Sequence, residues 1–291
     1  MRESRQALCQ RGDSFLKLWY LRFTRRVLQP WPDCSHGWRK WCKPPMAVQR
    51  SVAMWCCNAA LQNGEKNVAL ELLAEEQVEI SGFGGIRERV LVMDPRLFGH
   101  HVREECWPGF GACVYLANAW FLPGGSTGLH SHEQIDIVSV MTRGELHHQG
   151  SIGDGEVLQA GQVQLQRSGI KGFRHNEQNP GADYPAMVQI WLLPQSHEGE
   201  SYYQVIELNP SGLTCVYGGE LFAASTRVDV LQLAAGDEWT LDDDALGYVF
   251  RGTAISADGQ RLQRGDLFRL SGQSLSLMAE SGFALVMIRE A

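Results

Sequence analysis

The feature that most restricts the fold of this chain is a pattern of short strands and glycine turns that occurs twice. Each copy contains a strand, an Arg-Gly turn, a second strand, a Leu-Gln-x-Gly turn and a third strand; the turns lie at Gly144 and Gly161 in the first copy and at Gly252 and Gly265 in the second. Residues 162–166 alternate polar and apolar side chains, as a half-buried strand does. Short strands at regular spacing predict an all-β chain, and the repeat predicts two tandem β-barrels with few short helices.

Composition divides the chain into three parts. Residues 1–50 carry a net charge of +8, whereas the whole chain of 291 residues carries -7, and five of the eight cysteines fall within the first 57 residues. We therefore expect residues 1–60 to be a poorly ordered basic extension, 61–195 to be a first barrel and 196–291 a second. Two alternatives stay open for the extension: a later start at Met46 or Met54, or a basic amphipathic helix over residues 16–28 with a membrane-surface or targeting role.

Charge and cysteine spacing exclude several classes of protein. A net charge of -7 argues against a protein that binds nucleic acid through its phosphates. No apolar run is long enough to span a bilayer, and no Cys-x-x-Cys pair indicates a zinc knuckle or a redox dithiol. We expect a cytoplasmic, monomeric protein with reduced thiols and no membrane contact.

Two pairs of polar side chains have the spacing of a metal site. His130 and His132 are two residues apart, as are His175 and Glu177. Residues i and i+2 of a strand point to the same face, so two strands could bring three imidazoles and one carboxylate to one ion. Such a set suits Fe, Mn, Cu, Ni, Co or Zn and lacks the thiolates of a closed structural zinc site. The alternative is that the His-x-His pair lies on the surface or caps a turn.

The second copy of the repeat serves as an internal control for this site. No histidine follows His197, and where the first copy has Leu129 to His132 the second has Leu241 to Asp244. The glycines and apolar strands are kept while the histidines are not. The histidines are therefore separable from the fold, which favours a functional site, and we expect Asp242 to Asp244 to form a solvated acidic turn.

Residues 123–180 resemble the pirin family of the cupin superfamily. The first cupin motif, G-x5-H-x-H-x3-E-x7-G, is matched from Gly124 to Gly144, with Asp136 in place of the usual glutamate. The second part of the pirin pattern is matched by Ser168-Gly169, Gly172-Phe173 and His175-x-Glu177. The resemblance implies a bicupin of jelly-roll type, with His130, His132, His175 and Glu177 as the metal ligands.

The sequence departs from the family pattern in four places. They are Asp136, Ala160-Gly161 in place of Pro-Gly, a longer loop between Gly169 and Gly172, and a missing upstream aromatic stretch. All four ligand positions are kept, so these departures bear on the substrate more than on the metal. Asp136 follows His132, and we expect its carboxylate to accept the distal N–H of a ligand imidazole.

The resemblance also implies a function. Several bacterial pirins are similar to quercetin 2,3-dioxygenases, so we expect a dioxygenase that takes a flavonol-like small molecule and dioxygen, with one divalent transition metal, Fe(II) before the others, and with Glu177 as general base. We expect apolar cavity walls from Phe121, Ile135, Val140, Leu165 and Phe173. The alternative is a non-enzymatic regulator in which the redox state of the metal controls the binding of a protein partner.

Overall fold

The computed structural model describes residues 69–291, which are almost entirely strands and turns. The only α-helix in this range is the single turn α2 (Pro95–Phe98), and two short 3-10 turns lie at η1 (Glu75–Gln77) and η2 (Gly99–His101). The strands are β1 (Ala69–Ala74), β2 (Ile80–Ser81), β3 (Ile86–Met93), β4 (Cys113–Phe121), β5 (His130–His132), β6 (Asp136–Arg143), β7 (Glu145–Gly150), β8 (Val157–Gln159), β9 (Gln162–Arg167), β10 (Phe173–Gln178), β11 (Ala186–Leu192), β12 (Tyr202–Glu207), β13 (Gly212–Tyr217), β14 (Thr226–Leu233), β15 (Glu238–Leu241), β16 (Ala245–Arg251), β17 (Thr253–Ser256), β18 (Arg261–Gln263), β19 (Asp266–Ser271), β20 (Leu275–Ala279) and β21 (Phe283–Glu290).

The strands form two pairs of sheets with the same internal order. The first half has a seven-stranded sheet, β12-β9-β6-β11-β4-β3-β2, and a four-stranded sheet, β5-β10-β7-β8. The second half has a six-stranded sheet, β1-β19-β16-β21-β14-β13, and a four-stranded sheet, β15-β20-β17-β18. When ten is subtracted from each strand number of the second half, the strand orders match those of the first half. The exceptions are β1, which takes the position of β12, and β2, which has no counterpart in the second half. The predicted all-β fold and its duplication are thus confirmed.

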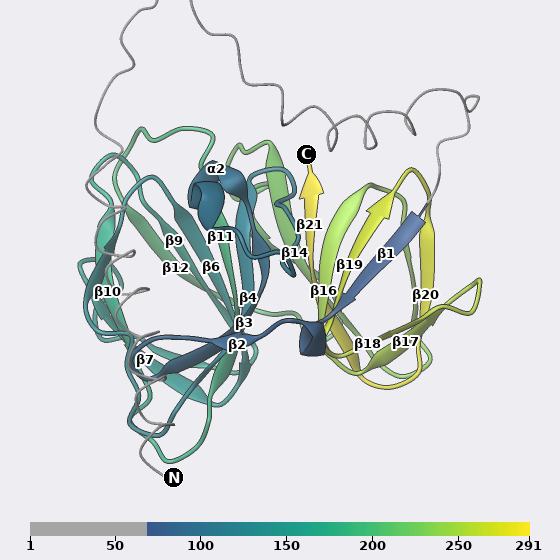
Figure 1. Cartoon of the computed structure of the whole chain (residues 1–291), viewed down its shortest axis with the longest axis horizontal. Coiled ribbons are helices and arrows are strands. Elements are labelled where there is room, and N and C mark those ends of the chain that lie inside the picture. Colours follow the sequence, from purple (N-terminus) through teal and green to yellow (C-terminus); the bar gives the residue numbers. More distant parts are fainter. Residues whose placement is uncertain (1–68) are drawn as a thin grey trace, which may run out of the picture.

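The sheets stack in four layers, with the two large sheets in the middle (Figure 1). Apolar side chains of both large sheets, such as Val138 and Val230, share one buried cluster that joins the halves. Each small sheet packs on the outer face of its large sheet, through clusters that include Leu146 in the first half and Leu277 in the second. The large sheets are therefore buried on both faces, which explains their nearly continuous apolar runs.

The strand pairing crosses the predicted boundary between the two barrels. Strand β1 lies in the part assigned to the first barrel, yet all six of its residues pair with β19 of the second half. Strand β12 lies in the part assigned to the second barrel, yet it pairs with β9 of the first. Figure 1 shows β1, in blue, among the yellow strands. The boundary at residues 195 and 196 therefore does not separate the sheets, because each half lends one edge strand to the other.

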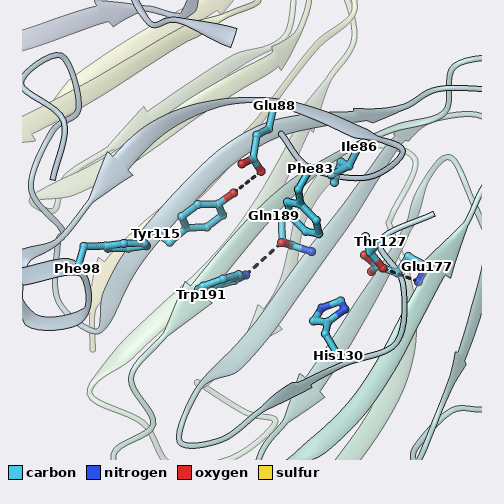
Figure 2. A pocket seen from close by; sticks show the side chains of 10 residues that line it. All are labelled: Phe83, Ile86, Glu88, Phe98, Tyr115, Thr127, His130, Glu177, Gln189 and Trp191. Carbon is cyan, nitrogen blue, oxygen red and sulfur yellow. Dashed lines mark hydrogen bonds between the residues drawn. The ribbon is translucent and has the colours of Figure 1, made fainter. Parts of the chain in front are cut away.

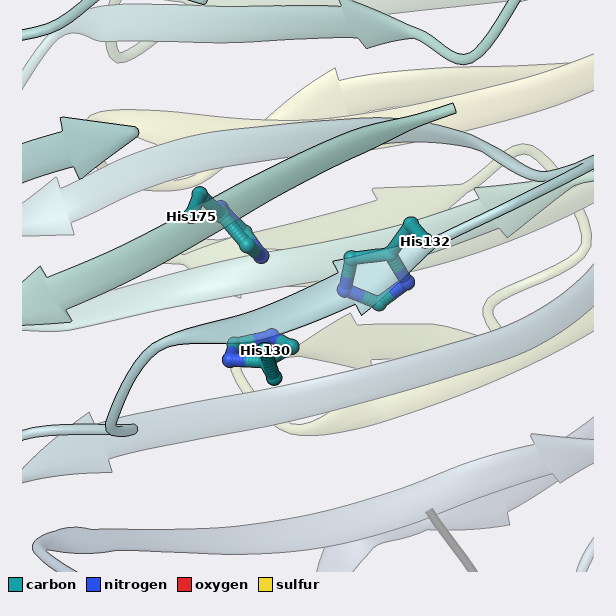
Figure 3. A group of neighbouring side chains, drawn as sticks. All are labelled: His130, His132 and His175. Carbon is teal, nitrogen blue, oxygen red and sulfur yellow. The ribbon is translucent and has the colours of Figure 1, made fainter. Parts of the chain in front are cut away.

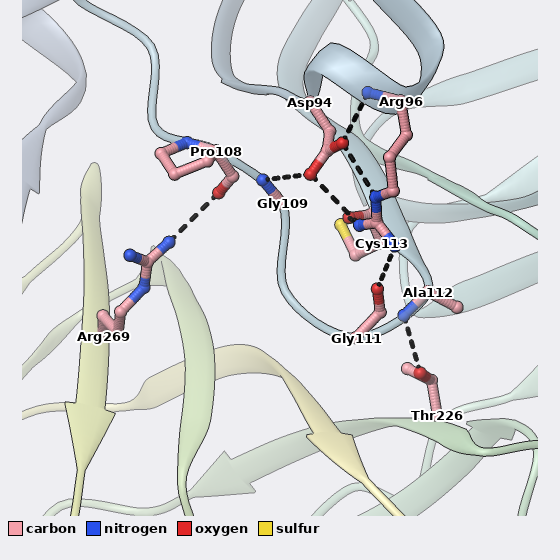
Figure 4. A network of polar contacts seen from close by, with 9 residues as sticks. All are labelled: Asp94, Arg96, Pro108, Gly109, Gly111, Ala112, Cys113, Thr226 and Arg269. Atoms are coloured by element: carbon pink, nitrogen blue, oxygen red, sulfur yellow. Dashed lines mark hydrogen bonds and ion pairs between the residues drawn. The ribbon is translucent and has the colours of Figure 1, made fainter.

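A loop of the first half is hydrogen-bonded to the second half (Figure 4). The Arg269 guanidinium donates to the carbonyl of Pro108 at 3.1 Å, and the Ala112 N–H donates to the Thr226 hydroxyl at 2.8 Å. Within the loop, the Asp94 carboxylate accepts hydrogen bonds from the Arg96 side chain and from the Gly109 N–H. These contacts join the loop of the first half to strands β19 and β14 of the second half.

Within residues 69–291, no helix is long and apolar enough to cross a membrane. The basic extension predicted for residues 1–60, with its alternatives, lies outside the described part of the chain.

Candidate metal centre

Three histidines converge on one point from strands β5 and β10 (Figure 3). The strands are antiparallel neighbours, with His130 opposite His175 and with His132 opposite Phe173. The ring centroids of His130 and His175 are 4.4 Å apart, and that of His132 lies within 5.0 Å of both. The two-residue spacing of the His-x-His pair thus places both rings on one face, as predicted, and β10 brings the third ring to them.

These three imidazoles could share a single ion. One ring nitrogen of each lies within 4.8 Å of the others. The Nδ1–H of His130 donates to the carbonyl of Gly128 at 2.7 Å, so the lone pair of this ring is on Nε2. His175 is 1% exposed, and both of its ring nitrogens are buried without a hydrogen-bond partner among the described residues. A buried imidazole without partners is costly, and a bound cation would satisfy one of its nitrogens.

Glu177 is the second inward-facing polar residue of β10 and is 1% exposed. Its carboxylate accepts a hydrogen bond from the Gln164 side chain at 3.2 Å, and Gln164 in turn accepts one from the Tyr203 hydroxyl at 3.1 Å. Burial raises the pKa of Glu177 to about 7, and the Gln164 hydrogen bond opposes that rise. The carboxylate is thus held in place and can exchange a proton near neutral pH.

A fourth histidine, His148 of β7, lies beside Glu177. Adjacent residues of a strand point to opposite faces, so only one of His147 and His148 can face the interior. His147 is partly exposed, and His148 is fully buried. One ring nitrogen of His148, one of His175 and one oxygen of Glu177 lie within 4.8 Å of one another. The four predicted ligands and His148 therefore form two overlapping groups that share His175.

Burial also lowers the pKa values of the buried histidines. The pKa values of His132 and His175 lie well below the usual 6.5, first because of desolvation and then because of the neighbouring histidines. The pKa of His148 is lowered by desolvation as well, against the opposing effect of its bond to Ile152. Neutral imidazoles are the form that binds metals, so the site is prepared for a cation.

The interior around these residues is polar in the first half and filled with apolar groups in the second. Ser139 and Gln164 are paired across β6 and β9, and their counterparts across β16 and β19 are Gly247 and Phe268. The Phe268 ring lies so close to Gly247 that even a Cβ added there would overlap it. In the first half, the Ser139 hydroxyl and both polar atoms of Gln166 are buried without partners in the described part of the chain. Unpaired polar groups of this kind usually surround bound water or a ligand.

The strand register identifies the residues of the second half that correspond to the candidate ligands of the first half. His148 and Ser256 are each four residues beyond the glycine of their Arg-Gly turn. His148 is paired with Glu177, and Ser256 is paired with Leu277. Leu277 therefore occupies the position of Glu177.

The same comparison corrects the alignment of the first histidine. His175 precedes Glu177 by two residues and is paired with His130, whereas Leu275 is paired with Leu241. The counterpart of His130 is thus Leu241 and not Asp242, a shift of one residue, and one residue reverses the face on a strand. Leu241, Leu275 and Leu277 all belong to one apolar cluster. The second half therefore keeps the strand pairing and has leucine at the positions of His130, His175 and Glu177, whereas the position of His132 is taken by the exposed Asp243.

A small aromatic cavity opens beside the histidines (Figure 2). His130, Glu177 and Thr127 lie at one end, and Phe98, Tyr115 and Trp191 lie at the other. Its volume is about 40 Å³, and its remaining lining residues are Phe83, Ile86, Glu88 and Gln189.

The far end of the cavity is an ordered stack. The rings of Tyr115 and Trp191 stack with centroids 4.5 Å apart, and Trp191 meets His132 edge to face at 5.3 Å. The Tyr115 hydroxyl donates to Glu88 at 2.7 Å, and burial raises the pKa of that carboxyl. The cavity thus joins the candidate metal centre to a flat aromatic wall that carries a buried acid.

Comparison with known proteins places this region in a family. Residues 95–192, which hold all four predicted ligands, match the family model Pirin. This segment is similar to the pirin family. A quercetin 2,3-dioxygenase from Escherichia coli is 31% identical over 90 residues, which is 31% of this chain and 38% of that relative. The predicted resemblance to pirins is confirmed.

Solved structures support the same fold. The bacterial pirin YhhW from E. coli, determined with nickel(II), superposes with a TM-score of 0.66 at 18% identity, over 76% of this chain and 99% of that one. A quercetin 2,3-dioxygenase from Acinetobacter baumannii superposes with a TM-score of 0.56 at 22% identity, over 76% of this chain and 85% of that one. At these identities the likeness establishes the shared bicupin fold.

The structure places Asp136 differently from the prediction. This carboxylate is 1% exposed and accepts hydrogen bonds from the Arg167 side chain, the Ser168 N–H and the Tyr217 hydroxyl, at 3.2, 2.9 and 3.0 Å. Tyr217 belongs to β13 of the second half. The structure therefore gives Asp136 a role in joining the two halves, and the expected hydrogen bond to a ligand imidazole is not among these contacts.

The predicted cavity walls differ from the residues that line the aromatic cavity, although the Phe173 ring lies 5.3 Å from that of His132 and 5.4 Å from that of His175. None of Phe121, Ile135, Val140, Leu165 and Phe173 lines the aromatic cavity. Val140 and Leu165 point the other way, into the cluster between the two large sheets. Because both faces of these strands are buried, apolar character alone does not reveal which face borders the candidate site.

Proposed function

We propose that this protein is a metal-dependent dioxygenase of the quercetin 2,3-dioxygenase type that acts on a flavonol-like small molecule. The observation that carries the proposal is the group of His130, His132 and His175 beside the buried Glu177, at one end of an aromatic cavity. The names of the relatives in E. coli and A. baumannii point to the same activity.

The donor set fits a single divalent transition metal. Three neutral imidazoles and one carboxylate, without a thiolate, can bind Fe(II), Mn, Cu, Ni, Co or Zn. Of these ions we propose Fe(II). The unpartnered nitrogens of His175 indicate that the protein alone does not complete the site. When bound, the ion would supply Lewis acidity toward the oxygen atoms of the substrate and the redox chemistry that dioxygen requires.

Glu177 is the proposed general base. A base works best when its pKa is near the working pH, and burial brings the pKa of this carboxyl to about 7. Gln164 holds one carboxylate oxygen, which limits the rotation of the group. The carboxylate would take the proton of a substrate hydroxyl at the cavity end where His130 also lies.

The far wall of the cavity would receive the flat part of the substrate. Tyr115 and Trp191 offer stacked ring faces, and Glu88 offers a polar group for a phenolic hydroxyl. The present volume of about 40 Å³ holds only a few water molecules, whereas drug-sized ligands occupy about 300–1,000 Å³. A flavonol would therefore bind only if the aromatic side chains move apart, so smaller enediol-like substrates belong in the first assay panel.

The test is substrate and dioxygen consumption by protein reconstituted with each metal in turn. We expect quercetin or a smaller analogue to disappear with an equal amount of dioxygen. Glu177→Gln, compared at equal metal content, should be slower by about 10²–10⁴-fold, as for loss of a general base. Glu145→Gln, on the exposed side of β7, is the matched control and should keep full activity.

Protein that carries one metal ion per chain and consumes neither dioxygen nor any compound of the panel would contradict the proposal. Capture of a partner protein that depends on the redox state of the metal would then support the regulatory alternative.

A further inference from the structure

His148 occupies a position that the family pattern does not assign to the metal. It stands on β7 directly opposite Glu177 of β10. Its side chain is fully buried, and its ring centroid lies 5.5 Å from that of His175 and 5.1 Å from that of Tyr203. The imidazole therefore points into the interior of the first half, toward two predicted ligands.

The orientation of this ring is fixed by the backbone. The Nε2–H of His148 donates to the carbonyl of Ile152 at 2.9 Å, so the lone pair is on Nδ1. The backbone of His148 is itself held by the Glu156 carbonyl and by the Gly155 N–H. The ring thus has a defined tautomer and a defined direction before any ligand binds.

The other ring nitrogen is available for a ligand. Nδ1 of His148 is buried and has no hydrogen-bond partner among the described residues. An imidazole that donates one N–H to a backbone carbonyl and leaves its second nitrogen free is the usual arrangement of a metal-binding histidine. His130 likewise donates one ring N–H to a backbone carbonyl, that of Gly128.

The distances suit an ion shared by His148, His175 and Glu177, and His175 also belongs to the group of His130 and His132. Donor atoms of His148, His175 and Glu177 lie within 4.8 Å of one another. An ion bound at about 2.0–2.2 Å places neighbouring donors about 3–4 Å apart, so small side-chain movements close the site.

The second half shows that no histidine is needed here for folding. The position of His148 is taken by Ser256 in the same strand pairing, next to Leu277. The histidine is therefore present in the half that has the polar site, and the β-hairpin itself does not require it.

We propose that His148 is a fifth protein ligand of the metal, in addition to His130, His132, His175 and Glu177. The proposal rests on the metal site of the proposed function. A six-coordinate ion would then keep one open position instead of two, and a substrate that binds through two oxygens would have to displace one protein donor. Substrate choice would depend on how readily that donor leaves.

The test counts coordinated imidazoles in the wild-type protein. The full chain, labelled with ¹⁵N at histidine and loaded with ¹¹³Cd(II), is observed by NMR, where each bound ring nitrogen shifts and couples to cadmium. Cadmium is chosen because it is diamagnetic and accepts six ligands. We expect four coordinated imidazoles in the wild type and three in His148→Gln, with cadmium affinity about 10–100-fold lower in the variant. His147→Gln, on the exposed face of the same strand, should leave both results unchanged.

Three coordinated imidazoles in the wild type would overturn the assignment of His148 while keeping the metal site. The same holds if His148→Gln keeps four, or weakens binding without losing a coordinated ring. No cadmium binding at all would contradict the metal site itself. The wild-type count does not depend on whether the variant folds.

Discussion

At the scale of single residues, the centre is built from groups that are unfavourable in the metal-free protein. His175 buries two ring nitrogens without partners in the described structure, and Glu177 is held where burial raises its pKa to about 7. Buried polar atoms without partners each cost about 1–3 kcal/mol. Such residues persist at functional sites because a ligand compensates for them, which is the simplest explanation of this group.

The lowered pKa values predict that acid destabilises the metal-free protein. Below pH 6.5 the unfolded chain protonates His132 and His175 while the folded chain does not, so acidification favours unfolding. Glu177 acts in the opposite direction, because its folded pKa is raised to about 7 and the folded state binds its proton first. Together, these three groups make the unfolded state bind about one proton more than the folded state between pH 6.5 and about 5. The unfolding free energy should therefore fall by ~1.4 kcal/mol for each pH unit of acidification in this range.

The measurement is denaturant unfolding of metal-free wild type and His175→Leu across that range. Because the leucine variant lacks one titrating imidazole, its advantage over wild type should grow by ~1.4 kcal/mol for each pH unit of acidification. A difference between the two proteins that stays constant with pH would contradict the burial of a neutral His175.

Some of these residues could be predicted from the sequence and others could not. The two-residue spacing of His130 with His132 and of His175 with Glu177 determines a common face on any strand, so their convergence needed only the pairing of β5 with β10. The inward orientation of His148 could not be predicted in this way, because the adjacent His147 is also a histidine. Only the pairing of β7 with β10 determines which of the two faces inward.

At the scale of elements, β10 and β20 are the same strand with two different inner faces. His175 and Glu177 of β10 correspond to Leu275 and Leu277 of β20, which lie in an apolar cluster. The fold therefore accepts either set, and the polar set is the one that requires a ligand.

This correspondence predicts that the double variant His175→Leu/Glu177→Leu folds normally. Replacing buried, incompletely paired polar groups by apolar groups of similar size should leave the unfolding free energy of the metal-free protein unchanged or raise it by about 1–3 kcal/mol, while metal binding is lost. Thermal and denaturant unfolding together with metal analysis check both parts. A variant that is strongly destabilised would show that the polar groups support the fold, contrary to our comparison of the two halves.

At the scale of the whole molecule, the two halves are not independent units. Strands β1 and β12 are exchanged between them, a shared cluster fills the space between the large sheets, and the Tyr217 hydroxyl of the second half binds Asp136 of the first. The second half thus supports the strands that carry the candidate metal centre, although its own interior is filled with apolar side chains.

The repeat in the sequence predicted this architecture but not its exchange of strands. Turn glycines such as Gly144 and Gly252, together with local alternation, reveal the strands and their duplication because these signals are short-range. The partner of an edge strand is a long-range contact, and no local pattern in residues 69–74 distinguishes β19 from a nearer strand. For the same reason, the cavity residues Tyr115, Trp191 and Glu88 could not be separated from other core positions.

The central claim is that the first half binds one transition-metal ion through His130, His132, His175 and Glu177. The most direct test is the metal content of protein purified without added metal, for wild type and Glu177→Ala side by side. Our account predicts about one transition-metal ion per wild-type chain and much less in the variant. Wild-type protein that holds no metal even after reconstitution, or a variant that keeps full occupancy, would contradict it.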